Sequence, residues 1–218
     1  CRDEAPLQLG SPGLRLAEQL KRAQREQPGR EVDLIAHSQG GVVVDVFLQD
    51  YYDAADPEYP PIGTVVTLSS PHEGAPLATA AGDWRASPVG KELVEAAEER
   101  LSVAPVAAPA VRQLDEHSRF LHDLWDDRLP DHVDFTTIGA TDDVIVPATQ
   151  VDVPDATKVV VGVGGGPLDD HANIPRDPGA LGVHGGDIAR YDLRAAGQLV
   201  LRRDEGVQVG ARVAAAGP

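Results

Sequence analysis

Three side chains have the types, and the order along the chain, that nucleophilic catalysis on a serine requires: Ser38, Asp143 and His171. A serine hydroxyl becomes a strong nucleophile when a neighbouring imidazole takes its proton, and a carboxylate orients and stabilises that imidazole. The histidine then acts first as general base and later as general acid, while the serine forms a covalent acyl intermediate that water hydrolyses. This chemistry requires no metal and no organic cofactor.

Ser38 lies at a predicted turn between a strand and a helix. The run Val32–Ala36 is short, apolar and rich in branched residues, which predicts a buried strand, and Gly40 to about Tyr52 suits a helix with a hydrophobic face. A serine at such a junction is typical of a nucleophile elbow, in which a strained backbone projects Oγ over the edge of the sheet. The alternative is an ordinary turn whose serine only caps the helix.

The residues around this serine suit a tight turn. Ala36 and Gly40, two positions before and two after it, are small, as they must be where strand and helix pass close together, and Gly41 adds further room. The start of a helix also favours a developing anion, because its N–H groups and its dipole point there. The backbone N–H of Gln39 is therefore the predicted oxyanion donor.

Two acidic residues follow the predicted strand Phe135–Gly139 and compete for the role of the acid. Asp142 lies closer to the strand. Asp143 is followed, after two residues, by Val146-Pro147, a usual setting of the acid in enzymes with this order of groups, and we prefer it. The alternative is that both aspartates only form an Asx turn.

The predicted base, His171, follows the strand Lys158–Val163 and a glycine-rich loop, and precedes a helix that begins near Pro178. In folds with a nucleophile elbow, serine, acid and histidine come in this order, each after a strand. His184 is the rival, but it lies beyond that helical stretch.

Two other histidines lie near predicted strand ends. His72 comes shortly after the predicted strand Ile62–Leu68 and is a candidate for lining the site. His37 directly precedes the serine and is expected to point away from it.

Buried strands alternating with helices predict the α/β class, with a mostly parallel sheet covered by helices on both faces. The first helix is expected at Ser11–Gln27. Residues 1–205 are predicted to form one domain. Residues 75–130 interrupt the alternation and suggest an inserted cap or lid, or else two crossover helices with long loops. Residues 206–218 are predicted to be a frayed tail.

Composition limits the partners of the chain. Its 218 residues carry a net charge of −16, which disfavours binding to nucleic acid or to an anionic membrane surface. No apolar run reaches the roughly 18 residues of a membrane span. Because Cys1 is the single cysteine of the chain, an internal disulfide and a cysteine-based metal site are excluded. The absence of methionine indicates a processed product or a fragment, so the location in the cell is not readable, and oligomeric state is left open.

Two further patterns do not have the spacing that phosphate or metal binding requires. The loop Gly162–Pro167 looks like a phosphate-binding loop, but Pro167 occupies the sixth place of the G-x-G-x-x-G pattern. The acidic and histidine residues near positions 126–132 and 169–171 lack an established ligand spacing for calcium or zinc. All three stretches are interpreted as loops.

Three segments resemble the α/β-hydrolase superfamily, and within it the bacterial lipases and esterases: Ala36–Gly41, Leu68–Ala78 and Thr141–Pro147. The resemblance covers about residues 10–200. It implies a serine ester hydrolase acting on a small-molecule or lipid ester, often with a lid over an apolar pocket. An acyltransferase with the same three groups, or a non-catalytic scaffold, remain the alternatives.

One departure from the family pattern concerns the oxyanion hole. In the family, the second oxyanion donor comes from a loop after an earlier strand, upstream of the helix that precedes the elbow. Here that helix, Ser11–Gln27, is the first predicted element, so the resemblance implies that the strand and its loop are missing. Loss of one donor lowers rates by a factor of about 10²–10³, and an edge of the sheet is expected to lie uncovered. Lower activity and stability than in a longer parent are therefore expected.

Overall fold

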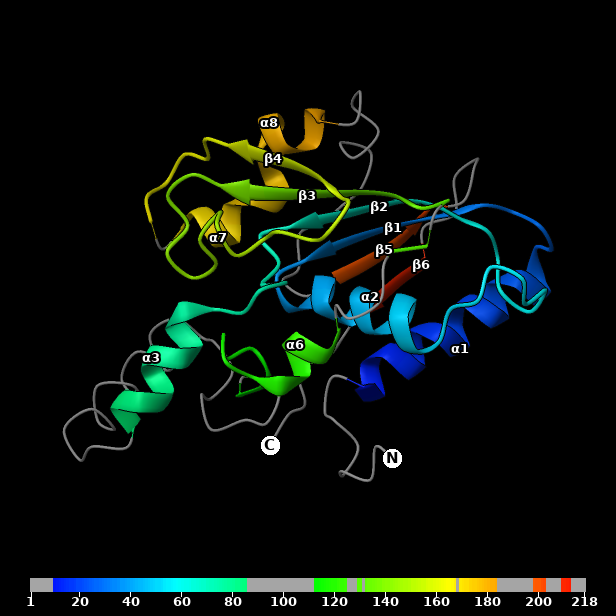
Figure 1. Cartoon of the computed structure of the whole chain (residues 1–218). Coiled ribbons are helices and arrows are strands. Elements are labelled where there is room, and N and C mark those ends of the chain that lie inside the picture. The colour runs from blue at the N-terminus through cyan, green and yellow to red at the C-terminus, as the bar shows by residue number, and fades with distance from the viewer. Residues whose placement is uncertain are drawn as a thin grey trace.

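The structure is a computed structural model, shown in Figure 1. It describes residues 10–85, 112–124, 129–130, 132–167, 169–183, 198–202 and 209–212. Its helices are α1 (Gly10–Glu26), α2 (Gln39–Asp50), α3 (Pro76–Arg85), α6 (Arg119–Leu124), α7 (Asp170–Asn173) and α8 (Pro178–Gly182), with a short 3-10 helix at Ile174–Arg176. Its strands are β1 (Val32–His37), β2 (Ile62–Leu68), β3 (Asp134–Ala140), β4 (Thr157–Val161), β5 (Gln198–Arg202) and β6 (Val209–Arg212).

The described strands form one sheet in the order β4-β3-β2-β1-β5-β6. Strands β1 to β4 pair in parallel, whereas β5 is antiparallel to β1, and β6 is antiparallel to β5. The mostly parallel sheet predicted from the sequence is confirmed, and the predicted strands and helices around Ser38 agree with the observed ones to within two residues. The carboxyl ends of β1 to β4 all point to the same edge, toward α3 and α7 at the left of Figure 1.

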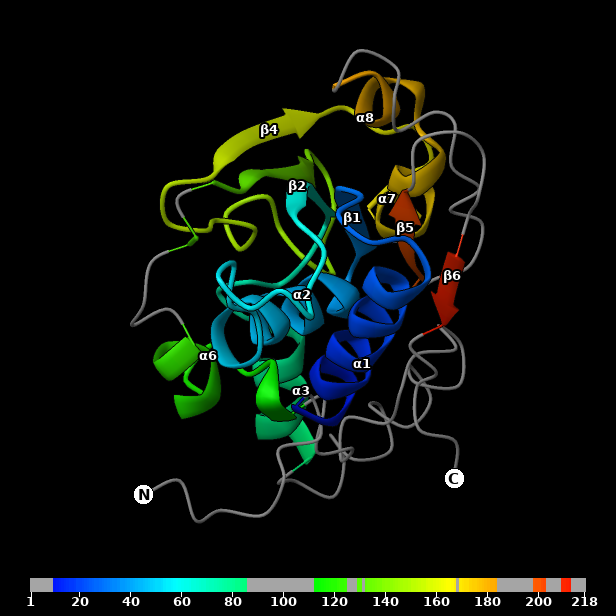
Figure 2. The same ribbon diagram turned by 90° about the vertical axis from the view of Figure 1, so that its right-hand side faces the viewer.

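Helices cover both faces of the sheet, as predicted. Leu34 on β1 belongs to a cluster with Leu20 of α1 and Phe47 of α2. The next residue, Ile35, belongs to a second cluster with Ile174 and Ala180, because successive side chains of a strand point to opposite faces. Figure 2 shows α1 and α2 on one side of the sheet and α7 and α8 on the other. Full burial of one such large side chain contributes about 1.5–3 kcal/mol to the stability of the folded state.

The prediction that every parallel strand is buried is wrong for β4. This strand lies at the edge of the sheet and pairs only with β3. Its first two residues are exposed, and Val160 keeps 49% of its surface in solvent. A run of valines indicates a buried strand equally well at the centre and at the edge, so only the strand order separates the two cases.

The C-terminal strands change the expected edge of the sheet. Residues 209–212, which the sequence analysis placed in a frayed tail, form β6 by pairing with β5. Strand β5 in turn pairs with β1 on the side expected to lie uncovered, where Leu34 opposes Leu201. The pairing of these strands is long-range, and local sequence signals therefore did not indicate it.

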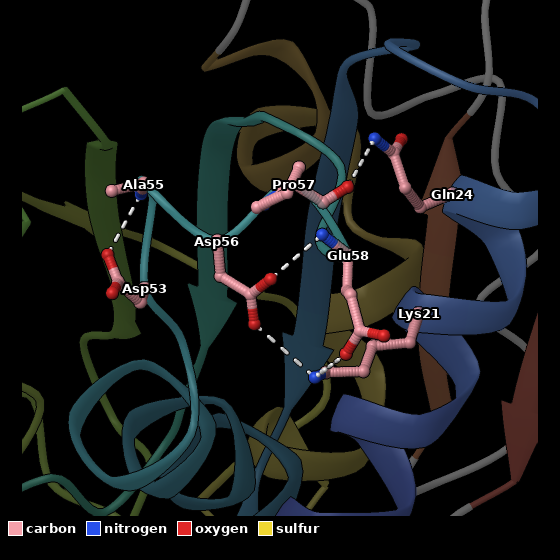
Figure 3. Close-up of polar contacts among 7 residues, drawn as sticks. All are labelled: Lys21, Gln24, Asp53, Ala55, Asp56, Pro57 and Glu58. Carbon is pink, nitrogen blue, oxygen red and sulfur yellow. Dashed lines mark hydrogen bonds and ion pairs between the residues drawn. The ribbon is translucent and has the colours of Figure 1, made fainter.

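Polar contacts join α1 to the connection between α2 and β2 (Figure 3). The Lys21 ammonium bonds to the carboxylates of Asp56 and Glu58 at 3.4 and 2.6 Å and lies 4.6 Å from the centre of the Tyr59 ring. The Gln24 side chain donates to the backbone oxygen of Pro57 at 3.0 Å. These contacts lie at the surface, far from the carboxyl edge, and exposed ion pairs of this kind add little stability.

The range 75–130, predicted as an inserted cap or two crossover helices, is described only in part. Helices α3 and α6 fall within it, while residues 86–111 and 125–128 lie outside the described residues. The backbone N–H of Ala75 donates to the oxygen of Leu114 at 2.8 Å and joins the two described parts. None of the helices described in the structure is long and apolar enough to cross a membrane.

Candidate active site

Ser38 occupies the turn between β1 and α2 in a rare backbone conformation. Its φ is 55° and its ψ −134°, outside the regions that residues with a β-carbon prefer. The Ser38 N–H donates to the oxygen of Leu68 at the end of β2, at 2.9 Å, which holds the turn against the neighbouring strand. The Ser38 side chain is half-buried and makes no helix-capping bond. An ordinary cap therefore does not describe this serine.

The close approach at this turn occurs at Gly41. A β-carbon built on Gly41 would lie 2.4 Å from the β-carbon of Ser70 and 3.2 Å from His72 Cε1. A β-carbon on Gly40 would lie 3.7 Å from that of Ala36, an ordinary contact. The sequence predicts that Ala36 and Gly40 must be small and that Gly41 only adds room. In the structure the stricter requirement lies at Gly41, because α2 packs there on the segment after β2.

We expect Gly41→Ala to destabilise the fold and Gly40→Ala to be tolerated. Overpacking against a buried neighbour costs about 1–3 kcal/mol. At Gly40 the added methyl group makes only an ordinary contact, and alanine is favoured over glycine within a helix by about 1 kcal/mol. Urea unfolding followed by circular dichroism compares the two variants, which differ only in the site of one methyl group. Equal stability of both would contradict the packing at Gly41.

The structure brings Ser38, His171 and Asp143 together. His171 Nε2 lies 2.9 Å from Ser38 Oγ, and His171 Nδ1 lies 2.8 Å from Asp143 Oδ2. The carboxylate can only accept, so Nδ1 carries a proton and Nε2 of the neutral ring accepts from the serine hydroxyl. The three side chains come from the segments after β1, β3 and β4, and they meet because parallel strands end at one edge.

Asp143 is held as a carboxylate. Its Oδ1 accepts from the backbone N–H groups of Ile145 and Val146, each at 2.9 Å. Burial acts to raise the pKa of Asp143, but the hydrogen bond and the charge of His171, together with the Val146 N–H, outweigh it and keep that pKa below its usual value. Asp142 is exposed at the adjacent position. Of the two aspartates left open by the sequence, only Asp143 contacts the histidine.

His171 lies in the short helix α7, where the sequence analysis expected a loop. The preceding glycine-rich loop is tied to this helix at Asp170, whose Oδ1 accepts from the N–H of Gly166 at 3.1 Å. Gly165 and Gly166 have positive φ values of 147° and 107°, which residues with a side chain rarely adopt. The Val144 N–H donates to the oxygen of Pro167 at 3.2 Å, a bond that joins the segment of Asp143 to the segment of His171.

His37 contacts His171 directly. Its Nε2 lies 2.8 Å from the backbone oxygen of His171, and the two ring centres lie 5.0 Å apart. The expectation that His37 points away from Ser38 did not include this contact. Burial, followed by the nearby His171, lowers the pKa of His37 to about 3. The ring is therefore neutral at ordinary pH.

We expect His37 to make the fold less stable in acid. The unfolded chain takes up a proton on this residue near pH 6.5, whereas the native chain does so only near 3. Stability contributed by the neutral ring is therefore complete above pH 6.5 and falls as the pH drops toward 3, by at most about 1.4 kcal/mol per pH unit. Unfolding of wild type and His37→Gln between pH 7 and 4 should show the shallower decline in the variant. Parallel curves would contradict the lowered pKa.

His72 does not line this site, contrary to the expectation from sequence. It is fully buried, with Nδ1 donating to Asp45 Oδ2 and Nε2 lying 2.8 Å from Thr67 Oγ1. Burial raises the pKa of Asp45, against the opposing effect of His72. Asp45 was not predicted as its partner, although a single acidic residue inside the apolar run of α2 is a signal for a buried polar contact.

Gln39 begins α2 beside Ser38, where the first N–H groups of a helix have no partner within the helix. This places the backbone N–H predicted as oxyanion donor next to Ser38. In the described ranges, no three or more His, Cys, Asp or Glu side chains gather as a metal site would require. The rival base His184 and the single cysteine Cys1 both lie outside the described residues.

No protein-family model and no curated protein matches this sequence. Solved structures nevertheless have a similar fold. The lipase BlEst2 of Bacillus licheniformis, in mature form, matches with a TM-score of 0.52 at 19% identity, over 77% of this chain and 71% of that one. A gene product of Listeria innocua gives a TM-score of 0.51 at 15% identity, over 79% and 63%. This chain has the α/β-hydrolase fold.

The α/β-hydrolase fold confirms the fold implied by the three sequence segments. At these identities the likeness concerns the fold. This chain spans 63% of the Listeria structure and 37% of BlEst2 with its propeptide, which matches with a TM-score of 0.50 at 20% identity. Within the α/β-hydrolase fold of this chain, the contacts of Ser38, Asp143 and His171 are the basis for a functional proposal.

Proposed function

We propose that this chain is a serine hydrolase that cleaves carboxylic esters through an acyl-enzyme on Ser38. The substrate would be a small-molecule or lipid ester. One observation carries the proposal: the unbroken line of hydrogen bonds from Asp143 through His171 to Ser38, with the serine held at a φ of 55°. The structural likeness to a protein named as a lipase supports it at the level of the fold.

In the first half-reaction, Ser38 Oγ attacks the acyl carbon and its proton passes to His171 Nε2. The C–O bond to the leaving alcohol breaks, and the alcohol oxygen takes the proton from His171. The Gln39 N–H would stabilise the negative charge on the carbonyl oxygen of the intermediate. Asp143 keeps the His171 ring in one tautomer and stabilises its positive charge, in line with the lowered pKa of this carboxyl.

In the second half-reaction, water attacks the acyl carbon and gives its proton to His171. The bond from the acyl carbon to Ser38 Oγ breaks, and Oγ recovers the proton. The products are a carboxylic acid and an alcohol. With an alcohol in place of water the same groups would transfer the acyl chain, so product analysis with and without added alcohol separates hydrolase from acyltransferase.

A fluorophosphonate probe tests the proposal, because it reacts with a serine activated by a histidine base. We expect mass spectrometry to find the probe on Ser38, and no labelling in Ser38→Ala. Ser118 is a matched control, since it is also half-buried but its hydroxyl donates to the backbone oxygen of Gln113, at 2.7 Å, and contacts none of the three side chains. Ser118→Ala should label like wild type. An unlabelled Ser38 in the folded chain would favour the non-catalytic scaffold instead.

A further inference from the structure

We propose that His37 is a positioning residue that sets the distance between His171 and Ser38. The inference rests on the proposed function, because it assigns His37 a role in the same reaction. His37 is the last residue of β1 and directly precedes Ser38, and its side chain reaches the backbone of His171 itself. One residue thus connects the strand that carries the nucleophile to the residue that carries the base.

The contact is a hydrogen bond with a defined donor. His37 Nε2 lies 2.8 Å from the His171 carbonyl oxygen, which can only accept, so Nε2 carries the proton. His37 Nδ1 is buried and has no hydrogen-bond partner within the described residues. The ring therefore supplies one directed bond to His171 and no other. A side chain that only filled space would not require a nitrogen at this place.

His171 needs such an anchor because its own segment is short. Helix α7 has four residues and follows a loop in which Gly165 and Gly166 take positive φ values. Within the described chain, the side-chain bonds of His171 go to Ser38 and Asp143, the two groups with which it would react or pair. The His37 bond instead holds the His171 backbone and leaves the imidazole free for proton transfer.

The position of the base is sensitive to small displacements. Misplacement of a reacting group by about 1 Å can lower a rate about 10²-fold. The His37 ring lies against the His171 ring, with centres 5.0 Å apart and planes tilted by 42°. Its neutral state, which follows from burial, keeps a second positive charge away from the imidazolium that forms in the reaction.

Three substitutions separate the hydrogen bond from the volume of the ring. The amide nitrogen of His37→Gln reaches about as far as Nε2, that of His37→Asn is one methylene shorter, and His37→Phe keeps an aromatic ring without a donor. With a short-chain p-nitrophenyl ester we expect kcat to fall about 10–100-fold in the Phe and Asn variants, with KM within about twofold. The Gln variant should keep kcat within about fivefold of wild type.

A second readout is independent of turnover. In nuclear magnetic resonance spectra, the proton signal of the His171 Nδ1–H that bonds to Asp143 should stay sharp in wild type and His37→Gln. The same signal should broaden in the Phe and Asn variants. Melting temperatures identify any variant that fails to fold. If wild type neither turns over ester nor labels at Ser38, the proposed function fails, and the resonance alone decides the role of His37.

Three results would overturn the inference. The first is an unchanged kcat in His37→Phe and His37→Asn, and the second is an unchanged His171 resonance in both. The third is an equal loss in all three variants, including His37→Gln, which would show that the ring volume matters and the bond to His171 does not. Rescue by glutamine but not by asparagine supports the inference.

Discussion

Asp143→Asn is expected to lower kcat for a short-chain ester by about 10³–10⁴-fold, with little change in KM. The amide presents a nitrogen donor as well as an oxygen, so the tautomer in which His171 Nδ1 donates to position 143 is no longer enforced. In the other tautomer Nε2 carries a proton and cannot take one from Ser38. The two backbone bonds to Asp143 Oδ1 should preserve the fold.

Asp142→Asn is the matched control, because Asp142 is adjacent, chemically identical and exposed. We expect its kcat to stay within about threefold of wild type, as for a surface charge that does not contact the reacting groups. Initial rates at several ester concentrations, measured for both variants at one pH, provide kcat and KM. A larger loss of kcat in Asp142→Asn than in Asp143→Asn would show that Asp142, and not Asp143, pairs with the histidine.

Asp45→Ala is expected to have the largest effect on stability. It leaves His72 fully buried beside Thr67 without its carboxylate partner. Removal of one member of a buried pair costs about 3–5 kcal/mol, a large part of the roughly 5–15 kcal/mol that stabilises a domain. Urea unfolding should show this loss, and Tm should fall by roughly 10 °C.

Two companion variants test whether the loss of stability comes from breaking the buried Asp45–His72 pair. Glu58→Gln removes an exposed partner of Lys21 and should leave unfolding unchanged within error, because surface pairs contribute little. The double variant Asp45→Leu, His72→Phe removes both buried polar groups and should be more stable than Asp45→Ala. A loss below about 1 kcal/mol in Asp45→Ala would show that the Asp45–His72 pair does not stabilise the fold.

The parallel part of the fold could be predicted from the amino-acid sequence. Val32–Ala36 and Ile62–Leu68 are apolar runs of strand length bounded by turn signals, and helical patterns separate them from their neighbours. Because parallel strands end at one edge, the order of Ser38, Asp143 and His171 after successive strands was enough to predict that the three side chains meet. The choice between Asp142 and Asp143 needed the hydrogen bond to His171.

The remaining features could not be predicted from the sequence, because each depends on contacts between residues far apart in the chain. The closeness of Gly41 to Ser70 follows from how α2 lies on the segment after β2. The place of β4 at an edge, and of β5 beside β1, follows from strand order, which local patterns do not encode. The reach of His37 to the His171 carbonyl spans 134 positions and exists only once β1 and α7 have packed together.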